Sequence, residues 1–175
     1  ERPGVPSERS GKRKKNLGDG IDLHAGGEDL IFPHHENEID QSEAANGKPF
    51  AHYWMHNAFL NIDNRKMSKS AGNFFTVRDI ISKYDPQVLR FFMLSAHYRS
   101  PLNFSAELME AAKNGLERIL TAVSNLNFLL SKAEDREMTE AEKKLLEEAK
   151  VYTARFDEAM DDDFNTADAI AAIFE

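Results

Sequence analysis

The chain has 175 residues, of which 41% are hydrophobic and 30% are charged, and its formal net charge is −8. These values are ordinary for a soluble globular protein, and the length suffices for one hydrophobic core or for one and part of a second. The absence of cysteine excludes disulfide bonds and fits a cytoplasmic protein. No apolar run approaches the roughly 18 residues of a membrane helix, so we expect no membrane partner.

Residues 1–20 are expected to form a basic, flexible lead-in. The stretch contains two prolines and four glycines and shows almost no apolar periodicity. A chain that is acidic overall can still bind RNA when one face is basic, so its net charge excludes little. The basic side chains of this stretch are Arg2, Arg9, Lys12, Arg13, Lys14 and Lys15.

Residues 21–78 favour a layer of parallel strands and helices. Alternating apolar residues predict a short strand at 21–24 that ends at Gly26-Gly27. A helix is expected from about 35 to 45, with a stop at Asn46-Gly47, and a buried parallel strand at 58–62. This order predicts an α/β, Rossmann-like half-domain.

After Asp85-Pro86, which suits a helix start, the pattern becomes helical. We expect a connecting helical region at 79–104 and the start of a helical bundle at 105–175. A further helix that begins at Asn165 runs to the last residue, so the chain looks truncated. Leu126 is expected to lie buried against the helix that begins after Thr139, where Thr139 and Glu142 form a capping-box pattern. The apolar stripe of the bundle comprises Leu108, Ala112, Leu116, Ile119, Val123, Leu126 and Leu130.

The segment Lys66-Met67-Ser68-Lys69-Ser70 carries two lysines three positions apart. With its hydroxyl side chains and the nearby Gly72, it suits a mobile loop whose ammonium groups offset charge on a pyrophosphate leaving group. An exposed polar turn is the commoner explanation for an arbitrary Lys- and Ser-rich stretch. The spacing alone leaves both interpretations open.

A second segment, His24–Glu38, combines glycines, acids and histidines. The Gly26-Gly27 pair at a strand end lets the backbone approach a ligand closely. Asp29 is placed to accept hydrogen bonds from a ribose diol, with a turn residue as the alternative. His34 and Glu38 are four positions apart, so they can face one side of a helix and share a metal, or else simply face solvent.

Both segments resemble motifs of class I aminoacyl-tRNA synthetases. Lys66–Ser70 is letter for letter the KMSKS signature of that class. His24–Glu38 closely resembles the motif H-x-G-G-x-D-L-x-F-P-H-H-E-N-E of cysteinyl-tRNA synthetases. The run Gln41–Ala44 and the acidic stretch Met160–Thr166 also match this family, and the resemblance extends from about Leu17 to the end of the chain.

The resemblance implies an enzyme of protein biosynthesis that activates cysteine with ATP and magnesium to a cysteinyl-adenylate and then transfers cysteine to its cognate tRNA. It implies that Lys69 contacts the ATP phosphates and that Lys66 supports the loop. Gly26, Gly27 and Asp29 are implied to border the adenosine ribose.

The resemblance also implies a zinc ion that selects cysteine through its thiolate, which soft zinc prefers to the hydroxyl of serine. His34 and Glu38 match two of its four ligands, and His24 is implied to lie near the substrate. The cysteine that supplies a third ligand falls on Arg9, and arginine cannot bind a metal. The HIGH motif and the remaining zinc-binding cysteine do not occur in the chain. We therefore expect the chain alone to be catalytically inert and to hold zinc poorly.

Two other functions stay open at this point. The paralogous cysteine ligase of mycothiol biosynthesis uses the same zinc site and adenylation, although the Met160–Thr166 stretch favours the synthetase. A non-catalytic tRNA-binding fragment is the alternative from a different class. The sequence gives no indication of the oligomeric state.

Overall fold

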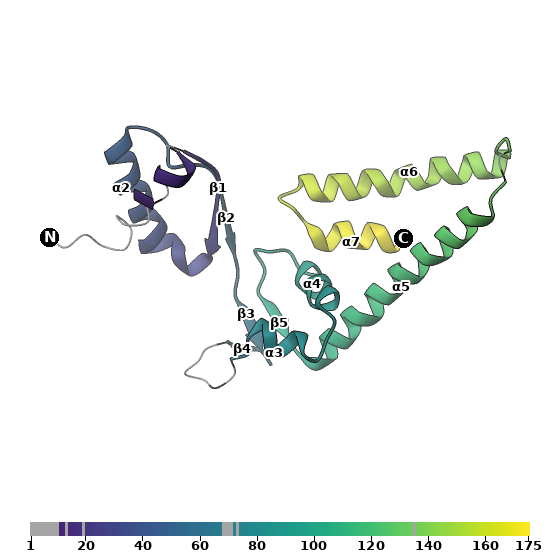
Figure 1. Cartoon of the computed structure of the whole chain (residues 1–175), viewed down its shortest axis with the longest axis horizontal. Coiled ribbons are helices and arrows are strands. Elements are labelled where there is room, and N and C mark those ends of the chain that lie inside the picture. Colours follow the sequence, from purple (N-terminus) through teal and green to yellow (C-terminus); the bar gives the residue numbers. More distant parts are fainter. Residues whose placement is uncertain (1–10, 13, 19, 68–71, 73, 135) are drawn as a thin grey trace. The chain divides into compact units, whose positions relative to one another are not determined.

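The computed structural model describes residues 11–12, 14–18, 20–67, 72, 74–134 and 136–175 (Figure 1). Its contacts divide the chain into two units, Glu1–Phe59 and Leu60–Glu175. The first unit contains the His24–Glu38 segment, and the second contains the Lys66–Ser70 segment. None of the described helices is both long enough and apolar enough to span a membrane.

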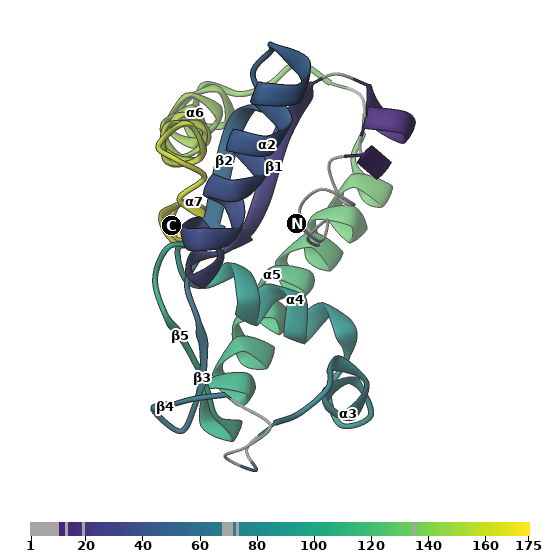
Figure 2. The same ribbon diagram turned by 90° about the vertical axis from the view of Figure 1, so that its left-hand side faces the viewer.

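The first unit is a strand–helix–strand arrangement (Figure 2). Strands β1 (Ile21–Gly27) and β2 (Ala51–Asn57) pair in parallel from end to end. Two short helices, η1 (Glu28–Leu30) and η2 (Ile31–His35), lead into α2 (Glu36–Asn46), which lies over one face of the strands. Parallel strands require a crossover of this kind because no tight turn can join them.

Helix α2 ends where the sequence predicts. Gly47 adopts a left-handed conformation with φ 65°, and its N–H donates to the Glu43 carbonyl at 2.8 Å. The Phe50 N–H donates to the Glu43 carboxylate at 2.9 Å, which holds the connection from α2 to β2. Ser42 of α2 is buried, and so is Phe50 in the connection that follows the helix. The small Ser42 side chain allows α2 to pack close to the strands.

One strand of this unit was not predicted, and one prediction is wrong. The parallel partner of β1 is β2, which reads A-H-Y-W-M-H-N and was missed because it lacks the continuous apolar run of a buried strand. Residues 11, 12 and 14–17 are helical where a loop was expected. Lysine is a good helix former, and the Lys14 ammonium also donates to the Asn46 side chain at 2.6 Å. Residues 1–10, including Arg9, lie outside the described residues.

The second unit begins with a three-stranded sheet in the order β4-β3-β5. Its central strand β3 (Leu60–Ile62) pairs antiparallel with β4 (Arg65–Lys66) and parallel with β5 (Leu102–Phe104). Helices α3 (Val77–Ile81) and α4 (Pro86–Leu94) lie between β4 and β5 in the sequence. The strand predicted at 58–62 thus exists as β3, but it pairs within this unit.

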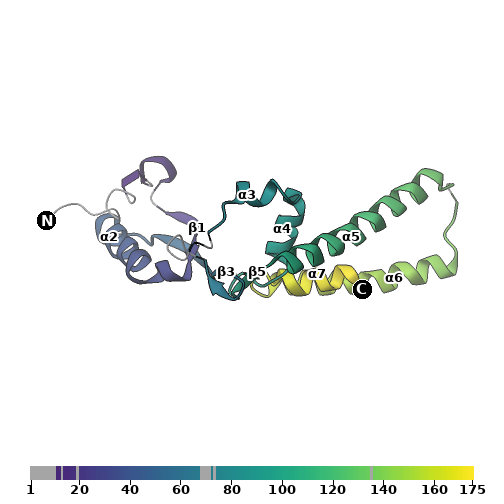
Figure 3. The same ribbon diagram turned by 90° about the horizontal axis from the view of Figure 1, so that it is seen from below.

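Three further helices complete the second unit (Figure 3). They are α5 (Ala106–Lys132), α6 (Glu140–Asp161) and α7 (Thr166–Phe174). Helices α5 and α6 diverge from their connection, and α7 folds back beside α6 (Figure 1). The ring of Phe174 meets that of Phe91 edge-on at 6.5 Å, which joins α7 to α4. The buried core between α4 and α5 comprises Val88, Phe92, Met109 and Ala112.

Side-chain caps begin these helices at the predicted residues. Thr139 and Glu142 form a reciprocal capping box at the start of α6. Pro86 occupies the first turn of α4, where its missing N–H costs nothing. The capping residues of α4, α5, α6 and α7 are Asp85, Ser105, Thr139 and Asn165.

The prediction that Leu126 is buried against α6 is wrong. Its side chain is 60% exposed, whereas Met109 in the second turn of α5 is 0% exposed. The predicted stripe has the right phase, since Ala112 is buried and Leu116 packs against the core. Among the described residues, however, α4 and the Phe174 ring of α7 contact the first half of α5, and the side chains of the stripe from Val123 onward are exposed. Apolar side chains of α5 and α6 that face solvent include Val123, Phe128, Leu129, Leu130, Leu145, Leu146 and Val151.

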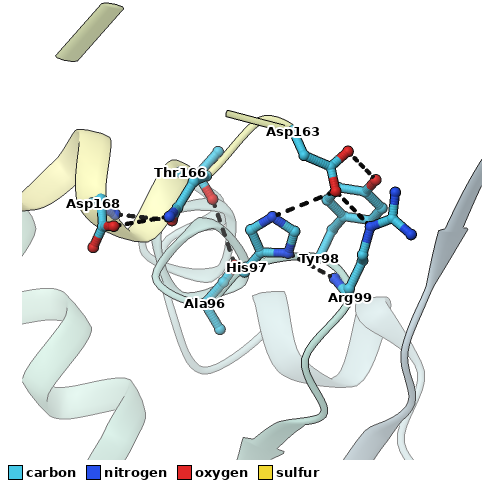
Figure 4. A network of polar contacts seen from close by, with 8 residues as sticks. Ala96, His97, Tyr98, Arg99, Asp163, Thr166 and Asp168 are labelled. Carbon is cyan, nitrogen blue, oxygen red and sulfur yellow. Dashed lines mark hydrogen bonds and ion pairs between the residues drawn. The ribbon is translucent and has the colours of Figure 1, made fainter. Parts of the chain in front are cut away.

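The turn between α6 and α7 is held to the loop after α4 by a polar network (Figure 4). The Asp163 carboxylate accepts from the Tyr98 hydroxyl at 2.7 Å and from Arg99 Nε at 2.5 Å. His97 Nε2 lies 3.9 Å from the same carboxylate, and the Thr166 hydroxyl donates to the Ala96 carbonyl at 3.5 Å. Loop and turn are therefore joined by side chains as well as by the apolar contacts of α7.

Candidate functional site

In the first unit, two residues of β1 and two of β2 lie on the same face of the sheet. Because strand side chains alternate between faces, His24 and Gly26 of β1 share a face. Their register partners on β2 are Trp54 and His56. This is the face over which α2 lies, so imidazoles from both strands point toward the helix.

Helix α2 and the residue before it complete the cluster. Glu38 in the first turn places a carboxylate oxygen 3.0 Å from His24 Nε2. His35, the last residue of η2, brings Nδ1 to 2.8 Å from His56 Nε2. Both Glu38 and His35 are 4% exposed. We call the residues His24, His35, Glu38 and His56 the imidazole cluster.

Aromatic rings enclose the imidazole cluster. Trp54 lies edge-on to His24 with ring centres 4.8 Å apart, and it stacks on His56 at 5.9 Å. Phe50 meets His24 edge-on at 5.2 Å. Burial in this apolar surround lowers the pKa of His35, and the neighbouring His24 lowers it further.

Gly26 is required by the close approach of His35. A Cβ at position 26 would lie 2.8 Å from His35 Cε1 and 3.1 Å from Leu30 Cδ1. At Gly27 a Cβ would lie 2.5 Å from Asp29 Oδ1, so the Asp29 carboxylate rests against the backbone at the end of β1. The glycine pair thus admits an imidazole on one side and a carboxylate on the other.

The sequence pairs His34 with Glu38 as metal ligands, whereas the structure brings Glu38 together with His24 and His35. One ligand atom each from His24, His35 and Glu38 lies within 4.8 Å of the others. Two imidazoles and a carboxylate are a donor set that zinc accepts. His34 does not join this group and is exposed, because η2 directs His35 toward the sheet instead.

Sequence reasoning missed His56 and Trp54 as parts of this site, and it considered His24 and His35 only as the first further zinc ligands to check if the chain retains zinc. The pattern H-x-W-x-H over residues 52–56 places aromatic and imidazole groups at alternate positions, which could have indicated one face of a strand. Which face of β2 meets the helix depends on the pairing of β1 with β2, and no local pattern encodes that.

The Lys66–Ser70 segment starts on a hairpin in the second unit. Asp63 and Asn64 have φ 47° and 62°, the left-handed values of a tight hairpin turn. The pairing of Lys66 with Asn61 and the hydrogen bond from the Met67 N–H to the Leu60 carbonyl at 3.3 Å hold the beginning of the segment. Lys69 and the two serines of the signature lie outside the described residues.

A capping box holds the chain on the far side of the signature. The Thr76 N–H and hydroxyl donate to the Asp79 carboxylate at 2.8 and 2.6 Å, and the Asp79 N–H returns a bond to the Thr76 hydroxyl at 3.2 Å. These hydrogen bonds lower the pKa of Asp79. The Thr-x-x-Asp pattern, which sequence reasoning did not use, marks this start of α3.

Comparison with protein families matches two stretches of the chain. Residues 1–114 match the family described as tRNA synthetases class I (C) catalytic domain. Residues 155–175 match the DALR domain, which begins within α6 and includes α7. The first match contains both the imidazole cluster and the Lys66–Ser70 segment.

Similar curated proteins share sequence along nearly the whole chain. A protein from Lachnospira eligens named cysteine–tRNA ligase is 70% identical over 174 residues, which is 99% of this chain and 37% of that relative. Proteins of the same name from Lachnoclostridium phytofermentans and Bacillus cytotoxicus are 63% and 58% identical, each over 99% of this chain. The chain spans 37 to 38% of the length of these relatives.

Two solved structures share the fold at low sequence identity. A LeuRS–tRNA–LeuAMS ternary complex from Agrobacterium radiobacter matches 87% of this chain and 21% of that one, with a TM-score of 0.72 and 17% identity. Methionyl-tRNA synthetase of Mycobacterium tuberculosis in complex with methionyl-adenylate matches 86% of this chain and 31% of that one, with a TM-score of 0.66 and 22% identity. Parallel strands with helices, followed by a helical region, are thus confirmed as the fold class.

Proposed function

The chain belongs to the class I tRNA synthetase catalytic family of the (C) type, and from this premise we propose that it forms part of an enzyme that ligates cysteine to its cognate tRNA through a cysteinyl-adenylate. The observation that carries the proposal is the identity with proteins named cysteine–tRNA ligase along nearly the whole chain. The match of residues 155–175 to the DALR domain supports a synthetase over the mycothiol-type cysteine ligase. We propose a cytoplasmic location for this activity, and the lack of disulfide-forming cysteine in this chain is compatible with it.

ATP is proposed as the nucleotide substrate, with roles for residues of both segments that the sequence singles out. The Asp29 carboxylate, which lies against Gly27 at the end of β1, belongs to an exposed residue and can accept hydrogen bonds from the ribose hydroxyls. Lys66 and Lys69, with magnesium, are proposed to offset the charge that grows on the pyrophosphate as the adenylate forms. These roles follow from the resemblance and from the exposed position of Asp29 beside the glycine pair.

Zinc is proposed to select cysteine, with His34 and Glu38 among its ligands. When bound, zinc would hold the substrate thiolate and discriminate against serine. The burial of Glu38 and the 3.0 Å approach of His24 Nε2 to its carboxylate support this role of Glu38, because neighbouring groups fix the orientation of a ligating carboxylate. The rival set is His24, His35 and Glu38, favoured by their mutual approach within 4.8 Å.

The test of the function uses a hybrid enzyme, in which this chain replaces the matching 174-residue region of the Lachnospira eligens ligase. Cysteine-dependent ATP–pyrophosphate exchange above the level of cysteine-free reactions is the expected result. Exchange that is absent in the hybrid but present in the unaltered Lachnospira protein would show that this chain has lost the chemistry and favour the non-catalytic tRNA-binding alternative.

Zinc analysis of the same hybrid separates the two ligand sets. The change His34→Ala should lower the zinc content after dialysis against a mild chelator, whereas His35→Ala should retain it. The opposite result would assign the metal to His24, His35 and Glu38. Because the zinc content is measured on the purified protein, the answer does not depend on activity.

A further inference from the structure

The turn that precedes the signature segment is held from outside by strand β5. In a hairpin turn of two residues, the central N–H groups normally point to solvent. Here the Asp63 N–H donates to the Phe104 carbonyl at 3.3 Å, and the Asn64 N–H donates to Asn103 Oδ1 at 2.7 Å. Both central amides of the turn are therefore bound to β5.

The Asn103 side chain reaches a group that the β5 backbone does not reach. Asn103 pairs in register with Asn61, two positions before the turn, so its main chain lies level with the middle of β3. Its carboxamide extends past the end of the β3–β5 ladder to the Asn64 N–H. The hydrogen bond is short for an N–H to oxygen pair, which commonly lies at about 2.9–3.0 Å.

The β3–β4 hairpin depends on an anchor of this kind. Its ladder has only two pairs, Asn61 with Lys66 and Ile62 with Arg65, and a hairpin of that size is marginally stable alone. Asp63 and Asn64 adopt left-handed conformations that aspartate and asparagine tolerate better than most residues, so the turn itself is compatible with its sequence. The two hydrogen bonds to β5 add support that the short ladder does not supply.

We propose that Asn103 is a positioning residue for the signature loop: by holding the Asn64 N–H, it orients the hairpin that delivers Lys66 and the following residues to the nucleotide. The expected effect on the reaction rate rests on the proposed function. The role of Asn103 in holding the hairpin rests only on the contacts with β5. Only Arg65 lies between the anchored Asn64 and Lys66, so a tilt of the turn displaces the backbone of Lys66. Displacement of a catalytic loop lowers the rate of the chemical step more than the affinity for the amino acid.

Kinetics of the hybrid enzyme test the consequence. Asn103→Ala should lower kcat of ATP–pyrophosphate exchange about tenfold, since one hydrogen bond of ordinary strength is lost, with the KM for cysteine unchanged. Asn103→Asp keeps the acceptor oxygen and should stay within about twofold of wild type, because a single acceptor suffices for this bond. The matched control is Asn125→Ala, the same chemical change at an exposed position of α5, which should leave kcat unaltered.

Amide hydrogen exchange tests the geometry without requiring activity. In Asn103→Ala the amide of Asn64 should exchange faster, while amides in the core of α4 keep their protection. Unchanged exchange at Asn64, an unchanged kcat in Asn103→Ala, or an Asn103→Asp variant as slow as Asn103→Ala would each overturn the proposal. A hybrid without cysteine-dependent exchange would count against the proposed function alone, and amide exchange would still decide the role of Asn103.

Discussion

Arg99 and Asp163, 64 positions apart in the chain, meet through Nε and a carboxylate oxygen at 2.5 Å. The contact joins the loop between α4 and β5 to the turn between α6 and α7 (Figure 4). Hydrogen bonds from Arg99 and then from Tyr98 lower the pKa of Asp163. Both partners are largely exposed, so the contact orients the α6–α7 turn more than it stabilises the fold.

The first prediction concerns the pH dependence of this contact. A carboxyl group whose pKa is lowered in the folded state contributes stability above its unfolded pKa, and this contribution is lost as the pH falls through the folded pKa. Asp163→Asn removes the charge, while asparagine tolerates the left-handed φ of 54° at this position. The Tm of the variant should lie below that of wild type at pH 7, and the gap should close below about pH 4.

The control for that experiment is Asp157→Asn, which removes an exposed carboxylate from the middle of α6. Its Tm should follow that of wild type at both pH values. If the gap between Asp163→Asn and wild type persists undiminished at low pH, the charge of Asp163 does not hold the turn.

A second prediction compares two apolar residues of α5. Met109 is fully buried between α4 and α5, so Met109→Ala should lower the free energy of unfolding by roughly 2–5 kcal/mol. Leu126→Ala in the 175-residue chain should change it by only about 0.5 kcal/mol, because the side chain is 60% exposed. Urea denaturation of both variants measures the difference. A cost for Leu126→Ala equal to that for Met109→Ala would mean that this part of α5 is covered.

A third prediction concerns Gly26. In Gly26→Ala the new methyl group would press on the His35 ring and on Leu30, and overpacking of this kind typically costs about 1–3 kcal/mol. Amides of β1 and β2 should then lose protection against hydrogen exchange. Gly20→Ala is the matched control, because its Cβ would lie at an ordinary 3.8 Å from the nearest heavy atom, the Pro49 carbonyl oxygen. Equal protection in the two variants would show that His35 yields to the methyl group.

The fourth prediction concerns Lys69 in the hybrid enzyme. Lys69→Ala should slow pyrophosphate exchange on the order of 10²-fold with little change in cysteine affinity, because the ammonium acts on charge that develops in the transition state. Lys132→Ala at the exposed end of α5 provides the control for loss of one lysine. An unchanged rate in Lys69→Ala would contradict the assignment of the signature loop.

Local chemistry explains which elements could be predicted from the sequence. The starts of α4, α5, α6 and α7 were found because a cap and its helix lie within a few residues of each other. Gly47 marked the end of α2 for the same reason. Strand β5 was missed because three residues are too few to distinguish a strand from a loop, and β2 was missed because its alternating side chains are imidazole and aromatic groups and not aliphatic ones.

The parts of the candidate site that could not be predicted depend on contacts between distant residues. The sequence singled out Glu38 and the Gly26-Gly27 pair, but the approach of His35 to His56 requires the β1–β2 register and the kink in η2. Burial of the α5 stripe likewise depends on another element that packs against it. The sequence could predict that Leu126 lies on the apolar side of the helix, but it could not predict that this part of the helix is exposed. The roles of Lys69, His34 and Asp29 stay predictions.

Trp54 is the one tryptophan in the whole sequence, and it stacks on His56 inside the first unit. Indole fluorescence is therefore an optical signal from Glu1–Phe59 alone, whereas far-ultraviolet circular dichroism is dominated by the long helices of Leu60–Glu175. The two spectroscopic signals followed along one denaturation curve measure the units separately. If the midpoints coincide, the chain melts cooperatively; if they differ, the joint at Phe59-Leu60 divides two independently melting bodies.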